Sequence, residues 1–211
     1  MKLLNKTTCI FGLRGTGKTT FAEYLADNPA FNAIVYDTVR EYPTHKKFDV
    51  YRPVNSYSIG ELVNFINTYI KDYPDKKTKK YNLLVIDEGN RFAPGGGARL
   101  DPALVDLNDQ LRHPPYELGV VWIARRPTQL HPDIIGLADN VLCFLLTGKN
   151  DIQYLNDLKR TYGDAVEDLP KYHSVLLKDG KMHYVNPIKI GGKNEGRMSM
   201  AGIVHLDKRG D

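Results

Sequence analysis

The chain has 211 residues, a formal net charge of +4, and 42% hydrophobic and 26% charged residues, which are ordinary values for one globular domain. Its two cysteines, Cys9 and Cys143, lie in apolar runs, so we expect buried reduced thiols and exclude a cysteine-based metal site. No apolar run approaches the about 18 residues of a membrane helix, and no signal-peptide pattern is present, so we expect a cytoplasmic protein.

The first predicted strand, over residues 6–11, runs into a glycine-rich loop and a helix over residues 20–26. The loop, GLRGTGKT, matches the P-loop pattern G-x-x-x-x-G-K-T. Its glycines let backbone N–H groups face phosphate oxygens, and the helix N-terminus adds partial positive charge. We expect Lys18 to reach the β- and γ-phosphates of ATP and the Thr19 hydroxyl to bind Mg²⁺. The predicted nucleotide-binding residues are Gly12, Arg14, Gly15, Thr16, Gly17, Lys18, Thr19 and Thr20.

A second strand is predicted over residues 33–36, and a short third one over residues 48–51. Asp37 directly follows the second strand, at the end where ligands bind in open α/β sheets. Ser58 and Glu61 form a capping-box pattern, which predicts that an amphipathic helix begins there.

The next strand, over residues 82–86, is almost continuously apolar, as in a parallel strand buried on both faces. It ends in Asp87 and Glu88, which gives the Walker B pattern of apolar residues followed by an acid. An acid at this strand end projects into the nucleotide cleft. We therefore expect Asp87 to hold Mg²⁺ through water and Glu88 to orient or deprotonate the attacking water.

Residues 90–100 contain three consecutive glycines and two arginines, so we expect a mobile, cationic loop near the site. Asp101 and Pro102 are typical of a helix start. A buried strand is predicted over residues 118–124, and the polar residues 125–129 directly beyond it can sense a γ-phosphate.

Three elements are expected after this strand. The pattern predicts a short helix over residues 131–138 and a further buried strand over residues 140–146. Another helix is predicted to follow, with Asn150 or Asp151 as its N-cap.

A hairpin ends the regular pattern, with strands over residues 173–177 and 181–185 and an Asp-Gly turn that suits type I′. Residues 187–211 form a basic, glycine-containing tail, either disordered or placed on a neighbouring subunit. Strands otherwise alternate with helices, which predicts one α/β domain over residues 1–186 with a mostly parallel sheet between helices. By analogy with the P-loop class, the additional strand and Glu88 favour a RecA-like ATPase over kinases and GTPases.

Several stretches together resemble the HerA/FtsK superfamily of DNA-pumping ATPases. Residues 37–42 (DTVREY) are similar to the D-x-x-G-E-Y stretch of HerA-like proteins, and residues 85–94 (VIDEGNRFAP) look like their hhDEAHxFxP run. Leu111-Arg112-His113, Gly119 and residues 122–127 (WIARRP) look like the R-x-x-G…(S/T)QRP segment. The match continues through residues 128–134, residues 138–140 and the Leu169-Pro170 pair.

The resemblance implies that Lys18 and Thr19 bind phosphate and Mg²⁺, that Asp87 supports the metal, and that Glu88 is the catalytic base. Arg112 matches the position from which such rings offer an arginine finger to the neighbour's γ-phosphate. Its alternative role is a partner for the helix C-terminal dipole. The alternative fingers are Arg14, Arg91 and Arg99.

Two residues depart from the family pattern. The polar sensor Gln before Arg-Pro is Arg125 here; a cation can contact the γ-phosphate but cannot accept a hydrogen bond from water. The glycine of G-E-Y is Arg40. The chain also lacks the N-terminal barrel and membrane domains of cellular members, and its length resembles the genome-packaging ATPases of membrane-containing icosahedral viruses.

These features predict a homo-oligomeric ring that hydrolyses Mg-ATP and translocates double-stranded DNA to package a viral genome. Arg91, Arg99 or the basic residues 76–80 would hold the DNA backbone, so binding would be independent of sequence. For the basic loop we favour a solvated connector over this phosphate contact. A capsid or portal protein is the further partner that such a motor implies.

Three other functions are compatible with part of the sequence pattern. A small-molecule P-loop kinase normally lacks a Glu directly after the Walker B Asp, where this chain has Glu88, and carries an arginine-rich lid. A GTP switch needs an N-K-x-D signature, which is missing from this sequence. A filamentous-phage assembly or secretion ATPase of the Zot type shares part of the pattern but usually carries a membrane segment. DNA-stimulated release of phosphate would separate the translocase from the kinase.

Overall fold

The computed structural model describes residues 1–44, 46–71, 81–97, 99–188 and 204–205. The basic loop predicted at residues 75–80, and most of the predicted tail, lie outside the described residues. The strands are β1 (Thr7–Phe11), β2 (Ala33–Tyr36), β3 (Asp49–Tyr51), β4 (Leu83–Ile86), β5 (Gly119–Ile123), β6 (Asn140–Phe144), β7 (Ser174–Lys178), β8 (Lys181–Val185) and β9 (Val204–His205).

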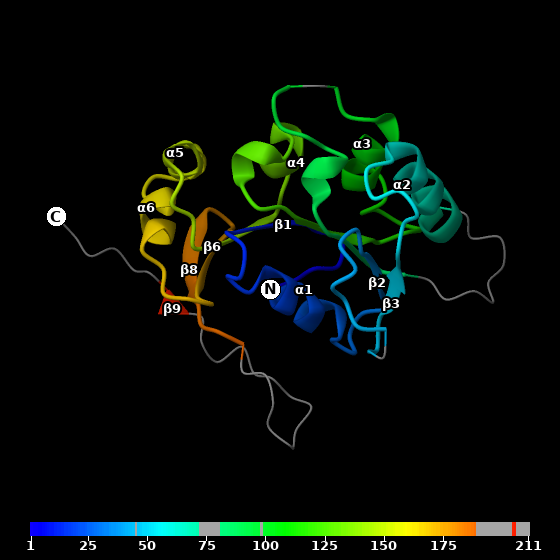
Figure 1. Ribbon diagram of the computed structural model, residues 1–211, viewed down its shortest axis with the longest axis horizontal. Coiled ribbons are helices and arrows are strands. Elements are labelled where there is room, and N and C mark those ends of the chain that lie inside the picture. Colours follow the sequence, from blue (N-terminus) through cyan, green and yellow to red (C-terminus); the bar gives the residue numbers. More distant parts are fainter. Residues whose placement is uncertain (45, 72–80, 98, 189–203, 206–211) are drawn as a thin grey trace, which may run out of the picture.

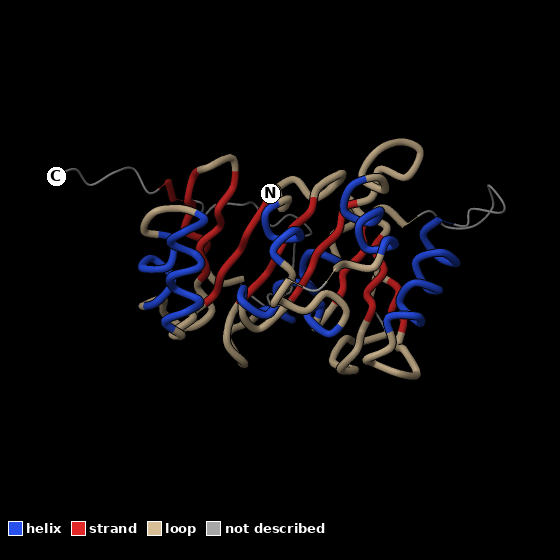
Figure 2. Tube along the Cα trace, turned by 90° about the horizontal axis from the view of Figure 1, so that it is seen from above, coloured by secondary structure: helices blue, strands red, loops and turns tan. Residues whose placement is uncertain are grey.

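The strands form one sheet in the order β3-β2-β4-β5-β1-β6-β7-β8-β9 and lie side by side along the molecule (Figure 2). Neighbours from β3 to β6 are parallel, whereas β7, β8 and β9 join by antiparallel pairing. The strand β5 lies between the P-loop strand β1 and the Walker B strand β4. This order confirms the predicted RecA-like, additional-strand P-loop fold.

Helices cover both faces of the sheet (Figure 1). One face carries α1 (Lys18–Ala26), whose Ala22, Leu25 and Ala26 pack with Ile10 and Val35 in one hydrophobic cluster. The opposite face carries the remaining helices, and a larger cluster lies beneath them. They are α2 (Ile59–Phe65), continued by a π-helix (Ile66–Lys71), α3 (Pro102–Asp109), α4 (Pro132–Gly136), α5 (Lys149–Leu158) and α6 (Tyr162–Glu167).

Alternation along each central strand explains this two-sided core. In β4, Leu84 and Ile86 belong to one hydrophobic cluster, whereas Leu83 and Val85 belong to the other. Successive side chains of a strand point to opposite faces, so a strand covered by helices on both sides must be apolar throughout. Consequently, the continuous apolar runs predicted as parallel strands are the buried strands of the sheet.

The local turn predictions are largely confirmed. Asp179 and Gly180, between β7 and β8, have φ values of 50° and 69°, as a type I′ turn requires. Asp101 caps α3 by accepting a hydrogen bond from the Ala103 amide at 2.9 Å. Two residues of the predicted tail, in β9, pair with the edge of β8.

One predicted helix start and one predicted capping box need correction. The helix α5 begins at Lys149 after Gly148, and Asp151 lies inside it because its carboxylate accepts a hydrogen bond from the Thr128 hydroxyl at 2.7 Å. Ser58 does cap α2, yet the Glu61 carboxylate binds the amides of the preceding loop, at 2.7 Å for the nearer one. The loop competes successfully for that carboxylate, so only half of the capping box forms.

Both cysteines are buried free thiols, as expected. Burial raises the pKa of the Cys9 thiol and raises the pKa of the Cys143 thiol to about 12. Among the helices of the described residues, none is both long enough and apolar enough to span a bilayer.

Candidate active site

The P-loop joins β1 to α1 at the carboxyl edge of the sheet, and its glycines fit conformations and spaces that other residues would not. Gly12 has a φ of 154°, and a Cβ there would lie 2.6 Å from the Cβ of Phe144. Gly17 has a φ of 107° and is the N-cap of α1. The amides of Gly12 and Leu13 donate to the carbonyls of Arg125 and Leu145, at 3.3 and 3.1 Å. The ends of β5 and β6 thus fix the loop where β1 stops.

Lys18 curls back over the loop. Its Nζ donates to the carbonyl oxygens of Gly12 at 2.7 Å and Leu13 at 3.0 Å. Burial lowers the pKa of the Lys18 ammonium, while the nearby Asp87 and Glu88 carboxylates oppose that shift. The ammonium thus lies inside the loop and is bound to carbonyl oxygens. An anionic ligand there would gain a strong, charge-assisted contact.

The threonines of the loop have different surroundings. The Thr16 hydroxyl is buried and donates to the Leu13 carbonyl at 2.8 Å, which closes the loop. The Thr19 hydroxyl instead donates to Glu41 Oε2 at 3.3 Å, and Arg14 and Gly15 are exposed at the loop tip. Closure of the loop and contact with the acidic residues are thus separate tasks of Thr16 and Thr19.

Asp87 is the most perturbed acid of the site. It is 5% exposed, and one of its oxygens accepts a hydrogen bond from the Glu88 amide at 2.9 Å. Burial, together with the charges of Glu88, Asp37 and Glu41, raises the pKa of its carboxyl to about 7, although the hydrogen bond from the Glu88 amide acts to lower it. Four carboxylates therefore lie in one region of the sheet edge, an arrangement that a cation would stabilise.

Glu88 and Arg125 form an ion pair that joins β4 to β5. The Arg125 Nε donates to Glu88 Oε1 at 3.1 Å; the Arg125 side chain is 56% exposed and that of Glu88 15%. Glu88 has a φ of 50°, a left-handed conformation that is costly for a residue with a Cβ. The structure thus brings together Lys18, Thr19, Asp87, Glu88 and Arg125, although they follow three different strands, β1, β4 and β5.

Glu41 was not among the predicted site residues, yet it is the acid that Thr19 contacts. The buried Asp37 positions it, because the Asp37 carboxylate accepts hydrogen bonds from the amides of Glu41 at 3.1 Å and Tyr42 at 3.2 Å. Arg40 has a φ of 60°, where the family pattern has glycine. The D-x-x-x-E-Y spacing was the sequence signal for Glu41, since it places the acid one turn beyond Asp37.

Arg112 lies at the opposite edge of the sheet. Its Nη2 is 3.6 Å from Asp139 Oδ1, and Asp139 also accepts hydrogen bonds from Lys6 Nζ at 2.6 Å and the Thr7 amide at 3.0 Å. Thr7 begins β1 and Asp139 precedes β6, so this network marks the amino edge of the parallel strands. Within one chain, the structure does not bring Arg112 to the P-loop.

Two of the alternative arginine fingers, Arg91 and Arg99, lie nearer the carboxyl edge. The Arg91 guanidinium is 4.5 Å from the centre of the Tyr57 ring, and Arg99 lines a cavity of about 450 Å³ with His131 and Asp133. The loop that carries them is anchored, since the Gly95 amide donates to the Gln129 carbonyl at 2.8 Å.

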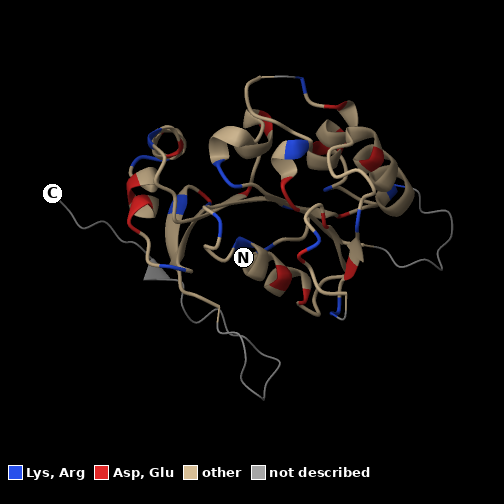
Figure 3. Cartoon of the chain, in the orientation of Figure 1, with Lys and Arg blue, Asp and Glu red and all other residues tan. Residues whose placement is uncertain are grey.

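Lys and Arg are interspersed with Asp and Glu across the described elements (Figure 3). Among the described residues, no group of three or more His, Cys, Asp or Glu side chains is arranged to hold a metal.

Solved structures share this architecture. The genome-packaging NTPase B204 of Sulfolobus turreted icosahedral virus 2, in complex with ATP-gammaS, aligns with a TM-score of 0.71 and 16% identity over 88% of this chain and 98% of its own. B204 of Sulfolobus turreted icosahedral virus aligns with a TM-score of 0.70 and 16% identity over 89% and 100% of the two chains.

A more distant similarity is to EssC, ATPases 2 and 3, from Geobacillus thermodenitrificans, with a TM-score of 0.57 and 13% identity over 92% of this chain and 41% of its own. No family model and no curated protein matches the sequence. At these identities the similarity concerns the fold. The P-loop NTPase fold expected from the sequence is thus confirmed: the chain shares this fold with the solved structures of B204.

Proposed function

We propose that this chain is an ATPase that assembles into a ring and translocates double-stranded DNA to package a genome. One observation carries the proposal: Lys18 and Thr19 of the P-loop meet Asp87, Glu88 and Arg125 at a single sheet edge. The fold shared with the B204 packaging NTPases over most of both chains supports it. The set contains an anion-binding loop, an acid for a metal, a base and a second cation.

The donor set at Thr19 and Asp87 fits Mg²⁺. A hydroxyl and a carboxylate are hard oxygen ligands, and Mg²⁺ is usually bound through one or two carboxylates together with substrate phosphates. The acidic surroundings that raise the Asp87 pKa provide the negative charge that a divalent cation requires. When bound, the ion would neutralise charge on the phosphates. Glu41, which accepts the Thr19 hydrogen bond, would orient that hydroxyl.

Glu88 is the proposed catalytic base and Arg125 the proposed γ-phosphate contact. In the ion pair, Arg125 binds Oε1 of Glu88, one of the two oxygens through which a base could accept a proton. A γ-phosphate would offer the exposed Arg125 a competing anion, and Glu88 would then be released toward water. Arg125, at the position of the family's Gln, would therefore contribute by binding the γ-phosphate and releasing Glu88, and not by accepting a hydrogen bond from water.

Arg112 is proposed to act on the neighbouring subunit. Its contact with Asp139 lies at the amino edge, so in one chain it stabilises the sheet, and only a second chain could bring it to a phosphate. A finger provided in trans stabilises transition-state charge and makes hydrolysis depend on assembly. Arg14, Arg91 and Arg99 are the alternatives, and all three lie on loops of the carboxyl edge.

The DNA would be held through its phosphates, with Arg91 and Arg99 as the described candidates, so binding should not depend on sequence. The decisive experiment measures ATP hydrolysis with and without duplex DNA, together with particle mass. We expect DNA-stimulated turnover that weakens with salt, in particles of several 23.9-kDa chains. A monomer whose turnover ignores DNA would exclude the translocase, and transfer of phosphate to a metabolite would indicate a kinase. A capsid or portal protein is the proposed docking partner.

The trans role of Arg112 is tested by mixing subunits. Arg112→Ala and Glu88→Gln should each be inactive alone, and mixtures should regain activity because an intact Glu88 site can then face an intact Arg112. Arg14→Ala, Arg91→Ala and Arg99→Ala are the parallel variants. Rescue by one of these and not by Arg112→Ala would move the finger to that residue.

A further inference from the structure

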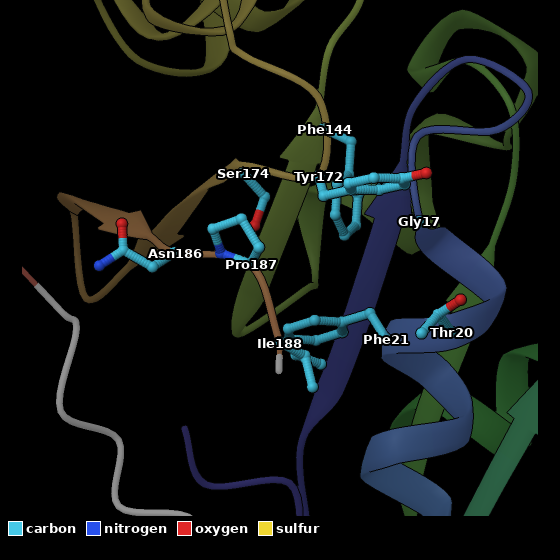
Figure 4. Close-up of a pocket in the computed structure, with 9 residues that line it drawn as sticks. All are labelled: Gly17, Thr20, Phe21, Phe144, Tyr172, Ser174, Asn186, Pro187 and Ile188. Atoms are coloured by element: carbon cyan, nitrogen blue, oxygen red, sulfur yellow. The ribbon is translucent and has the colours of Figure 1, made fainter. Parts of the chain in front are cut away.

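A cavity of about 300 Å³ opens beside the N-terminus of α1, at the low end of the usual size of small-molecule sites (Figure 4). Gly17 and Thr20 belong both to its lining and to the predicted phosphate-binding residues. A molecule whose anionic end lies in the P-loop would therefore place its other end in or near this cavity.

Aromatic side chains form much of the cavity wall. Figure 4 shows Tyr172 and Phe144 on one side and Phe21 and Ile188 on the other. The rings of Phe21 and Phe144 meet edge to face, with centroids 5.9 Å apart. The cavity wall is therefore largely apolar and aromatic, which suits a flat ring more than a sugar or a phosphate.

Tyr172 is held over the P-loop in an unusual conformation. Its φ is 68°, and a Cβ added to Gly17 would lie 3.2 Å from its ring. A non-glycine residue keeps such a backbone only where its surroundings determine it, and such positions cluster at ligand sites. The ring is nevertheless half-exposed, so part of its surface is available for contact.

The polar groups of the wall are few. Ser174 is 1% exposed, and in Figure 4 its hydroxyl points toward the cavity. Within the part of the chain that the structure describes, the lining contains no carboxylate. Guanine presents an N2 amino donor that adenine lacks, and a carboxylate is a natural acceptor for it. The polar side chains of the lining are the hydroxyls of Ser174 and Thr20 and the amide of Asn186. A largely apolar cavity without a carboxylate fits adenine better.

We propose that this cavity holds the adenine base of ATP, with the Tyr172 ring stacked on one face of the base and Phe21 packed against the other. The assignment rests on the proposed function, because it presumes that the P-loop binds the triphosphate. It adds the residues that recognise the base, and it divides ATP binding between a phosphate half at Lys18 and a base half at Tyr172.

The test uses two ligands that differ by the nucleoside. Calorimetric titrations with ATP and with inorganic tripolyphosphate are run on the unmutated protein, Tyr172→Ala, Tyr172→Phe and Lys18→Ala. Tyr172→Ala should weaken ATP binding about tenfold and leave tripolyphosphate unchanged, because stacking is lost and the P-loop is intact. Tyr172→Phe keeps the ring and should bind like the unmutated protein. Tyr69→Ala, which removes a similarly exposed ring from the π-helix, is the matched control and should change neither affinity.

The outcomes separate the two proposals. Equal weakening of both ligands by Tyr172→Ala, or of neither, would overturn the base site while the proposed function stands. GTP binding as tightly as ATP would overturn the adenine assignment. If the unmutated protein bound neither ligand, or Lys18→Ala kept both, the proposed function would fail and the base site with it. Photolabelling the unmutated protein with 8-azido-ATP needs no variant: the label should map to the cavity wall, and labelling elsewhere would contradict the proposal.

Discussion

The two edges of the central sheet both carry clustered charges, but they hold them differently. At the amino edge, Asp139 accepts hydrogen bonds from Lys6 and the Thr7 amide and lies beside Arg112, so each charge has an opposite partner. At the carboxyl edge, Asp87 is buried near other carboxylates with a pKa raised to about 7. Lys18 there is bound to carbonyl oxygens.

The two edges should therefore differ in what they contribute to stability. A satisfied network contributes to folding, whereas an excess of like charge in a buried place lowers stability until a ligand compensates it. The amino edge thus resembles a structural joint between β1 and β6, and the carboxyl edge has the charge distribution that the proposed function requires. Substitutions at the two edges should separate accordingly into effects on folding and effects on turnover.

The largest effect is expected for Glu88→Gln at the carboxyl edge. Turnover should fall by about 10²- to 10⁴-fold, because the general base is lost, while ATP binding remains. Gln can still accept from Arg125, so the unfolding temperature should hardly change. Steady-state hydrolysis, ATP titration and thermal unfolding together check this. Surviving turnover, or a much lower unfolding temperature, would contradict the claim that Glu88 serves turnover and not folding.

Asp139→Ala is the matching test at the amino edge. It leaves the Thr7 amide and two cations without their shared acceptor, which should lower the free energy of unfolding by about 2 kcal/mol. For a chain of this size that is a drop of roughly 4–8 °C in Tm. ATP affinity should stay the same. Asp157→Ala, at an exposed helix position, is the control and should change stability by less than about 0.5 kcal/mol. Weakened ATP binding in Asp139→Ala would show that the two edges are coupled.

Arg125→Gln tests whether a second residue of the carboxyl edge acts on the ligand and not on folding. The Arg125 side chain is more than half exposed, so its pair with Glu88 should contribute less than about 1 kcal/mol to folding. The preference for ATP over ADP should fall about tenfold, because a charged contact to the γ-phosphate is lost. Arg126→Gln is the matched control, since Arg126 is similarly exposed but faces Asp151. Equal losses in both variants would deny Arg125 a specific role.

Arg40→Gly should have the smallest effect and the opposite sign. Relief of the left-handed conformation at φ 60° outweighs the added chain entropy of glycine, so stability should rise by about 0.5 kcal/mol. Urea unfolding of Arg40→Gly and Arg40→Ala measures this, and alanine, which keeps the strain, should bring no gain. A less stable glycine variant would show that the exposed Arg40 side chain stabilises this loop.

Much of the site could be predicted from local pattern. The P-loop and the Asp87-Glu88 pair are short motifs in fixed positions after apolar runs, and such runs report burial on both faces of a parallel sheet. The predicted start of α5 was wrong because Asp151 is bound by Thr128 from a distant loop. Glu41 was missed for a similar reason, since its partner Thr19 belongs to another element.

The sequence by itself determined the class of the fold, the P-loop motif and the identity of the acids. Only the tertiary structure decided which charges meet: the placement of β5 between β1 and β4 sets Arg125 against Glu88, 37 positions away in the chain. The same strand order sends Arg112 to the far edge and brings Tyr172 over Gly17. Sequence spacing fixes neighbours within one element, whereas contacts between elements depend on the order of the strands, which long crossover connections leave open.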